Sequence, residues 1–260
     1  MEGCECFGPA MLLPERRLDK AYRKMIYENY ATRFQDAQDA FDPVAAARWG
    51  KAYRWYLRGW LPPRKEDAIA ELGCGSGRLL YFLRQMGYTN LHGVDISPEQ
   101  VALARQVVPS MEETDVLEWL DGRDDEFNLV IALDLVEHLT REEALRFLDL
   151  CLGALRPGGR LVLQTPNADS PFGLQHRYND ITHEWAYNVN QLERLLGRAG
   201  FRAIEAREQG PVPWGYSLAS TVRWLAWRCI RTGMKLWNLA ETGGPGSGIF
   251  TRVFLISGVK

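Results

Sequence analysis

Paired cysteine motifs and long apolar runs are both missing from this chain of 260 residues. Its five cysteines are too few for a disulfide scaffold, and none shows the C-x-x-C spacing of a structural zinc site. No apolar run approaches the roughly 18 residues of a spanning helix, and Pro14 interrupts the short N-terminal patch at residues 10–13. These absences favour a protein of the reducing cytoplasm.

An excess of one charge is missing as well. The 31 basic and 33 acidic residues give a formal net charge of -2, so no overall field attracts nucleic acid or an anionic membrane. The N-P-P-[YF] signature of enzymes that methylate base amino groups is also absent. We therefore expect no nucleic-acid partner, and any attraction to a membrane has to be local.

Short apolar runs alternate with helical stretches from residue 67 onward. The runs predict strands at residues 68–72, 91–96, 127–133, 160–165, 201–207 and 249–257. Such alternation is typical of a doubly wound α/β fold, in which helices cover both faces of a mostly parallel sheet.

Two further segments predict helices outside this alternation. Residues 15–60 repeat apolar side chains at intervals of about four, and Pro62-Pro63 ends that pattern. We therefore expect a helical cap at residues 1–62 and a doubly wound domain at residues 63–260. A helical insertion at residues 208–248 is expected before the last strand of that domain.

A glycine-rich turn directly follows the first predicted strand, where residues 71–78 read E-L-G-C-G-S-G-R. Glycines at a junction of strand and helix let the backbone approach a ligand closely and offer amide donors to it. The spacing is G-x-G-x-G, and Arg78 stands where a dinucleotide site needs its third glycine, which disfavours an oxidoreductase. The G-K-[ST] ending of a P-loop is missing too.

An acidic residue followed by this glycine spacing resembles the first motif of the class I S-adenosylmethionine-dependent methyltransferases, in particular their small-molecule and ubiquinone-type branch. Further matches follow in family order over residues 67–208, at 94–96 (V-D-I), 114–116 (T-D-V), 127–139 and 155–161. The resemblance implies a Rossmann-like sheet of seven strands, mostly parallel with an antiparallel last strand. It also implies S-adenosyl-L-methionine as the cofactor.

The family's cofactor contacts fall on matching positions of this sequence. Asp95 is expected at the ribose, because a carboxylate accepts two hydrogen bonds and a cis-diol donates two. Asp115 is expected to accept a bond from the adenine amine, and the end of the fourth strand is expected beside the methionine portion. The implied cofactor-binding residues are Glu71, Gly73, Cys74, Gly75, Gly77, Asp95, Ile96, Thr114, Asp115, Val116, Leu133 and Asp134.

A base is the main help that methyl transfer to a hydroxyl needs, because the methyl group is already activated. His183 follows the fifth strand at the edge of the sheet where ligands of this fold lie, and it is our first candidate. Asp180 or Glu184 is expected to orient it, and His138 is the second candidate. A hydrogen-bonded loop histidine with no catalytic part is the alternative.

A metal site is a further interpretation of the segment after the fourth strand. If it turns helical, Asp134, Glu137 and His138 share one face and could bind a hard divalent cation. Some ubiquinone-type O-methyltransferases carry a metal near the matching Glu-His pair. Most relatives with these residues use them to shape the cofactor pocket, so no metal is predicted.

Residues 216–240 predict a basic amphipathic helix. They contain no acidic residue, and Arg223, Arg228, Arg231 and Lys235 fall within one arc opposite an apolar stripe. Such a helix can lie in a membrane interface and bring the enzyme to a lipid-linked substrate. Alternatively it is a lid whose apolar stripe packs on the domain or on a second subunit of a homodimer.

Together these features predict an S-adenosylmethionine-dependent methyltransferase that most simply O-methylates a small-molecule, sugar (glycan) or lipid-linked acceptor. N- and C-methylation stay open. The alternative of another class is a catalytically silent module that binds S-adenosylmethionine and regulates a partner.

Overall fold

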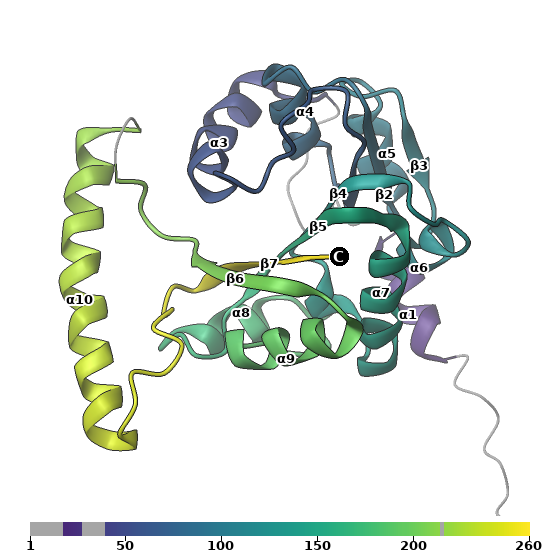
Figure 1. Cartoon of the computed structure of the whole chain (residues 1–260). Coiled ribbons are helices and arrows are strands. Elements are labelled where there is room, and N and C mark those ends of the chain that lie inside the picture. Colours follow the sequence, from purple (N-terminus) through teal and green to yellow (C-terminus); the bar gives the residue numbers. More distant parts are fainter. Residues whose placement is uncertain (1–17, 28–39, 214–215) are drawn as a thin grey trace, which may run out of the picture.

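One sheet of seven strands organises the part of the chain that this computed structural model describes, residues 18–27, 40–213 and 216–260 (Figure 1). The strand order is β3-β2-β1-β4-β5-β7-β6. The strands are β1 Ile69–Leu72, β2 Leu91–Asp95, β3 Met111–Glu113, β4 Phe127–Leu133, β5 Leu155–Pro166, β6 Arg202–Glu208 and β7 Val253–Val259. Only β7 among them runs against its neighbours, so the predicted mostly parallel sheet with an antiparallel last strand is confirmed.

Helices cover both faces of the sheet, as a doubly wound fold requires. The helices are α1 Leu18–Tyr27, α3 Pro43–Tyr56, α4 Arg78–Gln85, α5 Pro98–Ala104, α6 Val116–Leu120, α7 Arg141–Ala154, α8 Gly173–Asn179, α9 Val189–Ala199 and α10 Leu218–Thr242, with a 3-10 turn, η1, at Val136–His138. Alternate residues of β4 enter two different cores. Val130 packs with residues of α6, α7 and α9, whereas Leu129 packs with residues of α3, α4 and α5. The predicted fold class is therefore confirmed.

Three strand predictions need correction. The sequence pattern did not mark β3, because only Met111 of its three residues is buried at this sheet edge. β5 begins at Leu155 and not at residue 160, since Phe127 pairs with Leu155 before the register shifts. β7 begins at Val253 and not at residue 249, because the preceding carbonyl groups accept bonds from a loop side chain.

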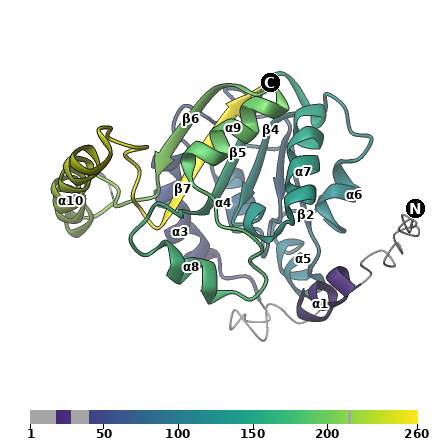
Figure 2. The same ribbon diagram turned by 90° about the horizontal axis from the view of Figure 1, so that it is seen from below.

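The helical segments outside the sheet lie where the sequence predicts them. The α1 and α3 helices fall in the predicted N-terminal cap, of which residues 1–17 and 28–39 lie outside the described residues. The α10 helix lies between β6 and β7 and stands to one side of the body (Figures 1 and 2). No helix in the described ranges combines the length and the apolar character that crossing a membrane requires.

The apolar stripe of α10 is turned outward, which contradicts one earlier interpretation. Leu218 is 82% exposed, Leu236 62% and Trp237 72%. A lid that packs its apolar stripe on its own domain is therefore wrong. The side toward the body carries Arg231, which pairs with Glu208, and the half-buried Trp227 beside Gly210.

Candidate active site

A cavity of about 440 Å³ lies at the carboxyl ends of β1, β2 and β4. This volume falls in the range of pockets that bury a small molecule or cofactor. The predicted site residues that line it are Glu71, Gly73, Cys74, Gly75, Asp95, Ile96, Asp115, Val116, Leu133, Asp134, His138, Asp180 and His183. Strand ends far apart in the sequence thus bring most of the predicted site together.

Two predicted cofactor residues, Gly77 and Thr114, do not line this cavity. Gly77 begins α4 with a φ of 80°, and a Cβ there would lie 3.0 Å from Cβ of Ala104. Its missing side chain lets α4 pack against α5. Thr114 lines a separate surface depression, and its amide donates to the carbonyl oxygen of Asp95.

The glycine turn adopts backbone conformations that favour glycine. Gly73 has a φ of 66° and Gly75 a φ of 50°. A Cβ at Gly73 would lie 3.0 Å from Cδ1 of Leu135, so a side chain here would collide with the neighbouring segment. The turn therefore presents bare backbone to the cavity.

Asp95 ends β2 and is held in place by the glycine turn. Its Oδ2 accepts from the amide of Gly75 and its Oδ1 from the amide of Ser97, each at 2.8 Å. Burial raises the pKa of Asp95, while these backbone bonds oppose the shift. Each carboxylate oxygen has two lone pairs, so each can accept one further bond from a ligand hydroxyl.

Glu71 and Asp115 complete this half of the site. Glu71 is buried, and no hydrogen-bond partner for its Oε2 lies among the described residues. A buried polar atom without a partner is costly, which points to a donor supplied by a ligand. Asp115 caps α6 by accepting from the amide of Leu117 at 2.8 Å.

The end of β4 is strained. Asp134 has a φ of 52°, a region that residues other than glycine rarely adopt. Its Oδ2 accepts from Nε2 of Gln164 at 2.9 Å, and Oε1 of Gln164 accepts in turn from the hydroxyl of Tyr53. The surrounding protein excludes water and raises the pKa of Asp134 to about 6.

His138 is held by a short chain of hydrogen bonds. The hydroxyl of Thr182 donates to Oδ1 of Asp180 at 2.6 Å, so its oxygen is left to accept from Nδ1 of His138 at 2.8 Å. A neutral ring with its proton on Nδ1 has Nε2 as an acceptor. Burial, and then the nearby His183, lower the pKa of His138 to about 4, which keeps the ring neutral near pH 7.

His183 lines the cavity beside His138, with 4.6 Å between the ring centroids. Its Nδ1 lies 2.9 Å from the carbonyl oxygen of His176, which can only accept. In the neutral ring the proton therefore sits on Nδ1, which leaves a lone pair on Nε2. Asp180 accepts from Thr182, which accepts from His138, while the carbonyl oxygen of His176 lies beside the ring of His183. The orienting role of Asp180 or Glu184 stays a prediction.

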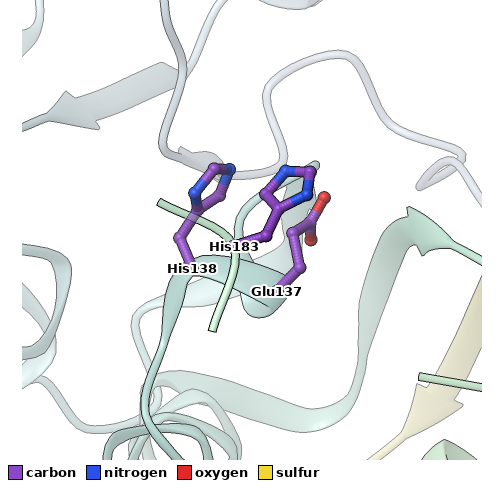
Figure 3. A group of neighbouring side chains, drawn as sticks. All are labelled: Glu137, His138 and His183. Carbon is purple, nitrogen blue, oxygen red and sulfur yellow. The ribbon is translucent and has the colours of Figure 1, made fainter. Parts of the chain in front are cut away.

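Glu137 brings a carboxyl group to the two imidazole rings (Figure 3). One potential ligand atom each from Glu137, His138 and His183 lies within 4.8 Å of the others. The structure thus replaces Asp134 of the predicted triplet with His183. Burial raises the pKa of Glu137 well above its ordinary value, and Asp134 adds to the shift.

Two cavity residues from α1, Arg23 and Tyr27, were missed by the sequence interpretation. Arg23 pairs with Glu143 at 2.8 Å, and no hydrogen-bond partner for its Nε lies among the described residues. The hydroxyl of Tyr27 lies 3.3 Å from Nδ1 of His138. No motif surrounds these residues in the sequence, and only the fold brings α1 to the cavity.

Comparison with known proteins gives a consistent result for sequence and fold. Residues 45–206 match the family model of a methyltransferase domain. The ubiquinone biosynthesis O-methyltransferase of Cereibacter sphaeroides (strain ATCC 17025) is 25% identical over 169 residues, which are 58% of this chain and 67% of that protein. The EEF1A lysine methyltransferase 4 of Mus musculus is 30% identical over 199 residues, 67% of this chain and 71% of that protein.

A solved structure shares the fold at lower identity. The crystal structure of a SAM-dependent methyltransferase from Archaeoglobus fulgidus superposes with a TM-score of 0.62 at 19% identity, covering 89% of this chain and 98% of that one. At this identity the likeness bears on the fold alone.

Proposed function

Since the chain belongs to the class I S-adenosylmethionine-dependent methyltransferase family, we propose that its cavity transfers the methyl group of S-adenosyl-L-methionine to a hydroxyl group of a small molecule. The observation that carries the choice of a hydroxyl is His183, whose Nε2 has a lone pair beside the cavity. A hydroxyl has to lose a proton during the transfer, and a base nearby accelerates that step.

The cavity residues fit the cofactor. We assign the ribose hydroxyls to the two oxygens of Asp95, the adenine amine to Asp115 and a donor of the methionine portion to the unpartnered Oε2 of Glu71. The bare backbone at Gly73 and Gly75 leaves room for close approach. When bound, the cofactor supplies a methyl group activated by a positively charged sulfur.

The chain's own residues then position the acceptor and take its proton. Nε2 of His183 accepts the hydroxyl proton as the acceptor oxygen forms its bond to the methyl carbon. His176 fixes the ring of His183 so that the same nitrogen always faces the cavity. Neutral His138 lies beside it and is the second candidate for the proton acceptor.

Exposed apolar side chains on α8 and in the loop after it suggest an acceptor with an apolar portion. Leu174 and Tyr178 of α8 are 72% and 76% exposed, and Ile181 is 78% exposed between the cavity residues Asp180 and His183. Apolar side chains exposed together are unusual unless they bind something. A quinone-like or lipid-linked acceptor fits these exposed apolar side chains better than a free sugar. The name of the Cereibacter relative agrees with O-methylation.

The experiment incubates the protein with methyl-labelled S-adenosylmethionine and separated soluble and membrane lipid extracts. We expect label in an alkali-stable methyl ether, and we expect His183→Ala to lose it while still binding S-adenosylhomocysteine. Label in protein lysine would instead favour the chemistry that the mouse relative's name describes. Tight cofactor binding with no transfer in any extract would support the silent regulatory module.

A further inference from the structure

The side of α10 toward the body mixes polar residues with the half-buried Trp224, Trp227 and Met234. Oγ of Ser220 donates to the carbonyl oxygen of Val212 at 2.7 Å, and Nδ2 of Asn238 donates to that of Gly244 at 2.7 Å. Arg231 pairs with Glu208 at 2.8 Å. A helix on the surface of a soluble domain normally packs its aliphatic side chains inward, whereas those of α10 are mostly turned outward.

The outward side of α10 is uncharged and exposed. We call it the outer face, and it comprises Leu218, Val222, Leu225, Cys229, Leu236 and Leu239. The exposed fractions of its leucines and valine range from 47% to 82%. These positions recur every three or four residues, so they form one continuous stripe along the helix. A contiguous apolar surface of this kind normally marks a binding site.

Basic side chains flank the outer face. At 100° per residue, Arg228 lies about 75° to one side of its middle and Arg223 about 145° to the other. Among the described residues neither they nor Lys235 form an ion pair, whereas Arg231 does. Glu241 is the one acidic residue in the sequence of α10. The helix thus has an apolar stripe with positive charge at its edges.

We propose that α10 lies in the surface of an anionic lipid bilayer, with the outer face in the boundary between headgroups and acyl chains. Long arginine side chains at the edges of the stripe reach phosphate groups while their stems stay beside the apolar surface. The helix stands at one side of the body in both views, so its outward side can rest on a plane (Figures 1 and 2). This contact goes beyond the proposed methyl transfer and does not depend on it.

A second copy of the chain fits the outer face less well. Two α10 helices that pair through their outer faces bring Arg223, Arg228 and Lys235 of one copy toward the same residues of the other. One acidic residue in each helix does not offset these like charges. Anionic headgroups satisfy the same side chains, and this charge complementarity decides in favour of the bilayer.

The test is co-sedimentation of the full chain with vesicles of phosphatidylcholine alone or with about 30% phosphatidylglycerol. We expect at least about tenfold tighter binding to the anionic vesicles, weakened by salt. Leu225→Ser with Leu236→Ser should reduce binding about tenfold or more, because both side chains are exposed and leave the fold intact. Arg223→Gln with Arg228→Gln should abolish the preference for anionic vesicles.

Matched controls separate the helix from the rest of the surface. Val44→Ser removes an apolar side chain that is 67% exposed on α3, and Arg198→Gln removes an exposed charge on α9. Both should bind vesicles like the unaltered chain, and every variant should keep its affinity for S-adenosylhomocysteine. Equal pelleting with and without vesicles would overturn the proposal. The proposal would also fail if the chain formed a dimer without lipid and the two serine substitutions dissociated it, because the outer face would then bind a second copy.

Discussion

Substitution of Asp95 is the most direct test of the cofactor assignment. The backbone amides of Gly75 and Ser97 each donate a hydrogen bond to one oxygen of its carboxylate, at 2.8 Å, and hold the group in one orientation. Both oxygens are therefore turned so that their remaining lone pairs can accept the two ribose hydroxyls. Asp95→Ala removes both acceptor oxygens. Asp95→Asn keeps one of them, but its side-chain NH₂ group then faces a backbone N–H group, and both are hydrogen-bond donors.

The magnitude follows from the number of bonds lost. A hydrogen bond to a charged group contributes about 1.5–3 kcal/mol, so losing two costs about 3–6 kcal/mol. The dissociation constant of S-adenosylhomocysteine should then rise about 10²–10⁴-fold for Asp95→Ala. Asp95→Asn loses one ribose bond and should weaken binding about 10–10²-fold.

Isothermal titration with S-adenosylhomocysteine measures both constants on folded protein, with circular dichroism as the check on folding. Asp149→Asn is the matched control, because Asp149 is an exposed partner of Arg198 on α7, and its affinity should stay within about twofold. If both Asp95 variants bound within threefold of the unaltered chain, the ribose would not lie at β2 and the cofactor assignment would fail.

Three further predictions concern the imidazole pair. His183→Ala should lower turnover about 10²-fold or more without changing cofactor affinity. The matched control is His92→Ala, which removes a ring that contacts Asn90 and Phe127 and should leave turnover unchanged. Equal turnover in the two variants would show that His183 is not the base. His138 has its pKa lowered to about 4 in the folded state, so the folded chain binds fewer protons than the unfolded chain between about pH 6.5 and pH 4. Stability from this group is full above pH 6.5 and falls by about 3 kcal/mol as the pH drops through that window. Urea unfolding measures the free energy of unfolding at pH 7 and pH 4, and this free energy should fall less for His138→Gln than for the unaltered chain. Equal decreases would contradict a buried neutral ring at His138. Dialysis against a chelator should leave turnover unchanged, because the proposed transfer uses His183 as its base and needs no cation. A loss of turnover that a divalent ion restores would assign Glu137, His138 and His183 to a metal.

The half of the site that we assign to the cofactor was predictable because its residues depend on local sequence. The glycine turn follows a strand and precedes a helix, and Asp95 ends the next strand, so the order of elements places both at one sheet edge. Gly77 shows the limit of this reasoning. Its spacing matched a ligand-binding motif, but its missing side chain serves the packing of α4 on Ala104.

The acceptor half was less predictable because its contacts join distant segments. Arg23 and Tyr27 approach the cavity from a helix that precedes the whole sheet, and Tyr27 reaches a residue 111 positions later. His183 was found from its place after the fifth strand, yet its orienting partner was not. A backbone carbonyl holds that ring, and any residue at position 176 offers the same carbonyl oxygen.

This division of the site has a physical cause. The backbone of β2 is hydrogen-bonded to β1 on one side and to β3 on the other. The position of Asp95 at the end of β2 therefore does not depend on the segments that cover the acceptor side. The acceptor side includes α1 and the segment that carries Asp180 and His183, which the sheet does not hold in this way. Substitutions there can change which acceptor fits without moving the cofactor. Arg23 and Tyr27 of α1 and the loop residue His183 are therefore the positions on which acceptor choice depends under the function proposed for this chain.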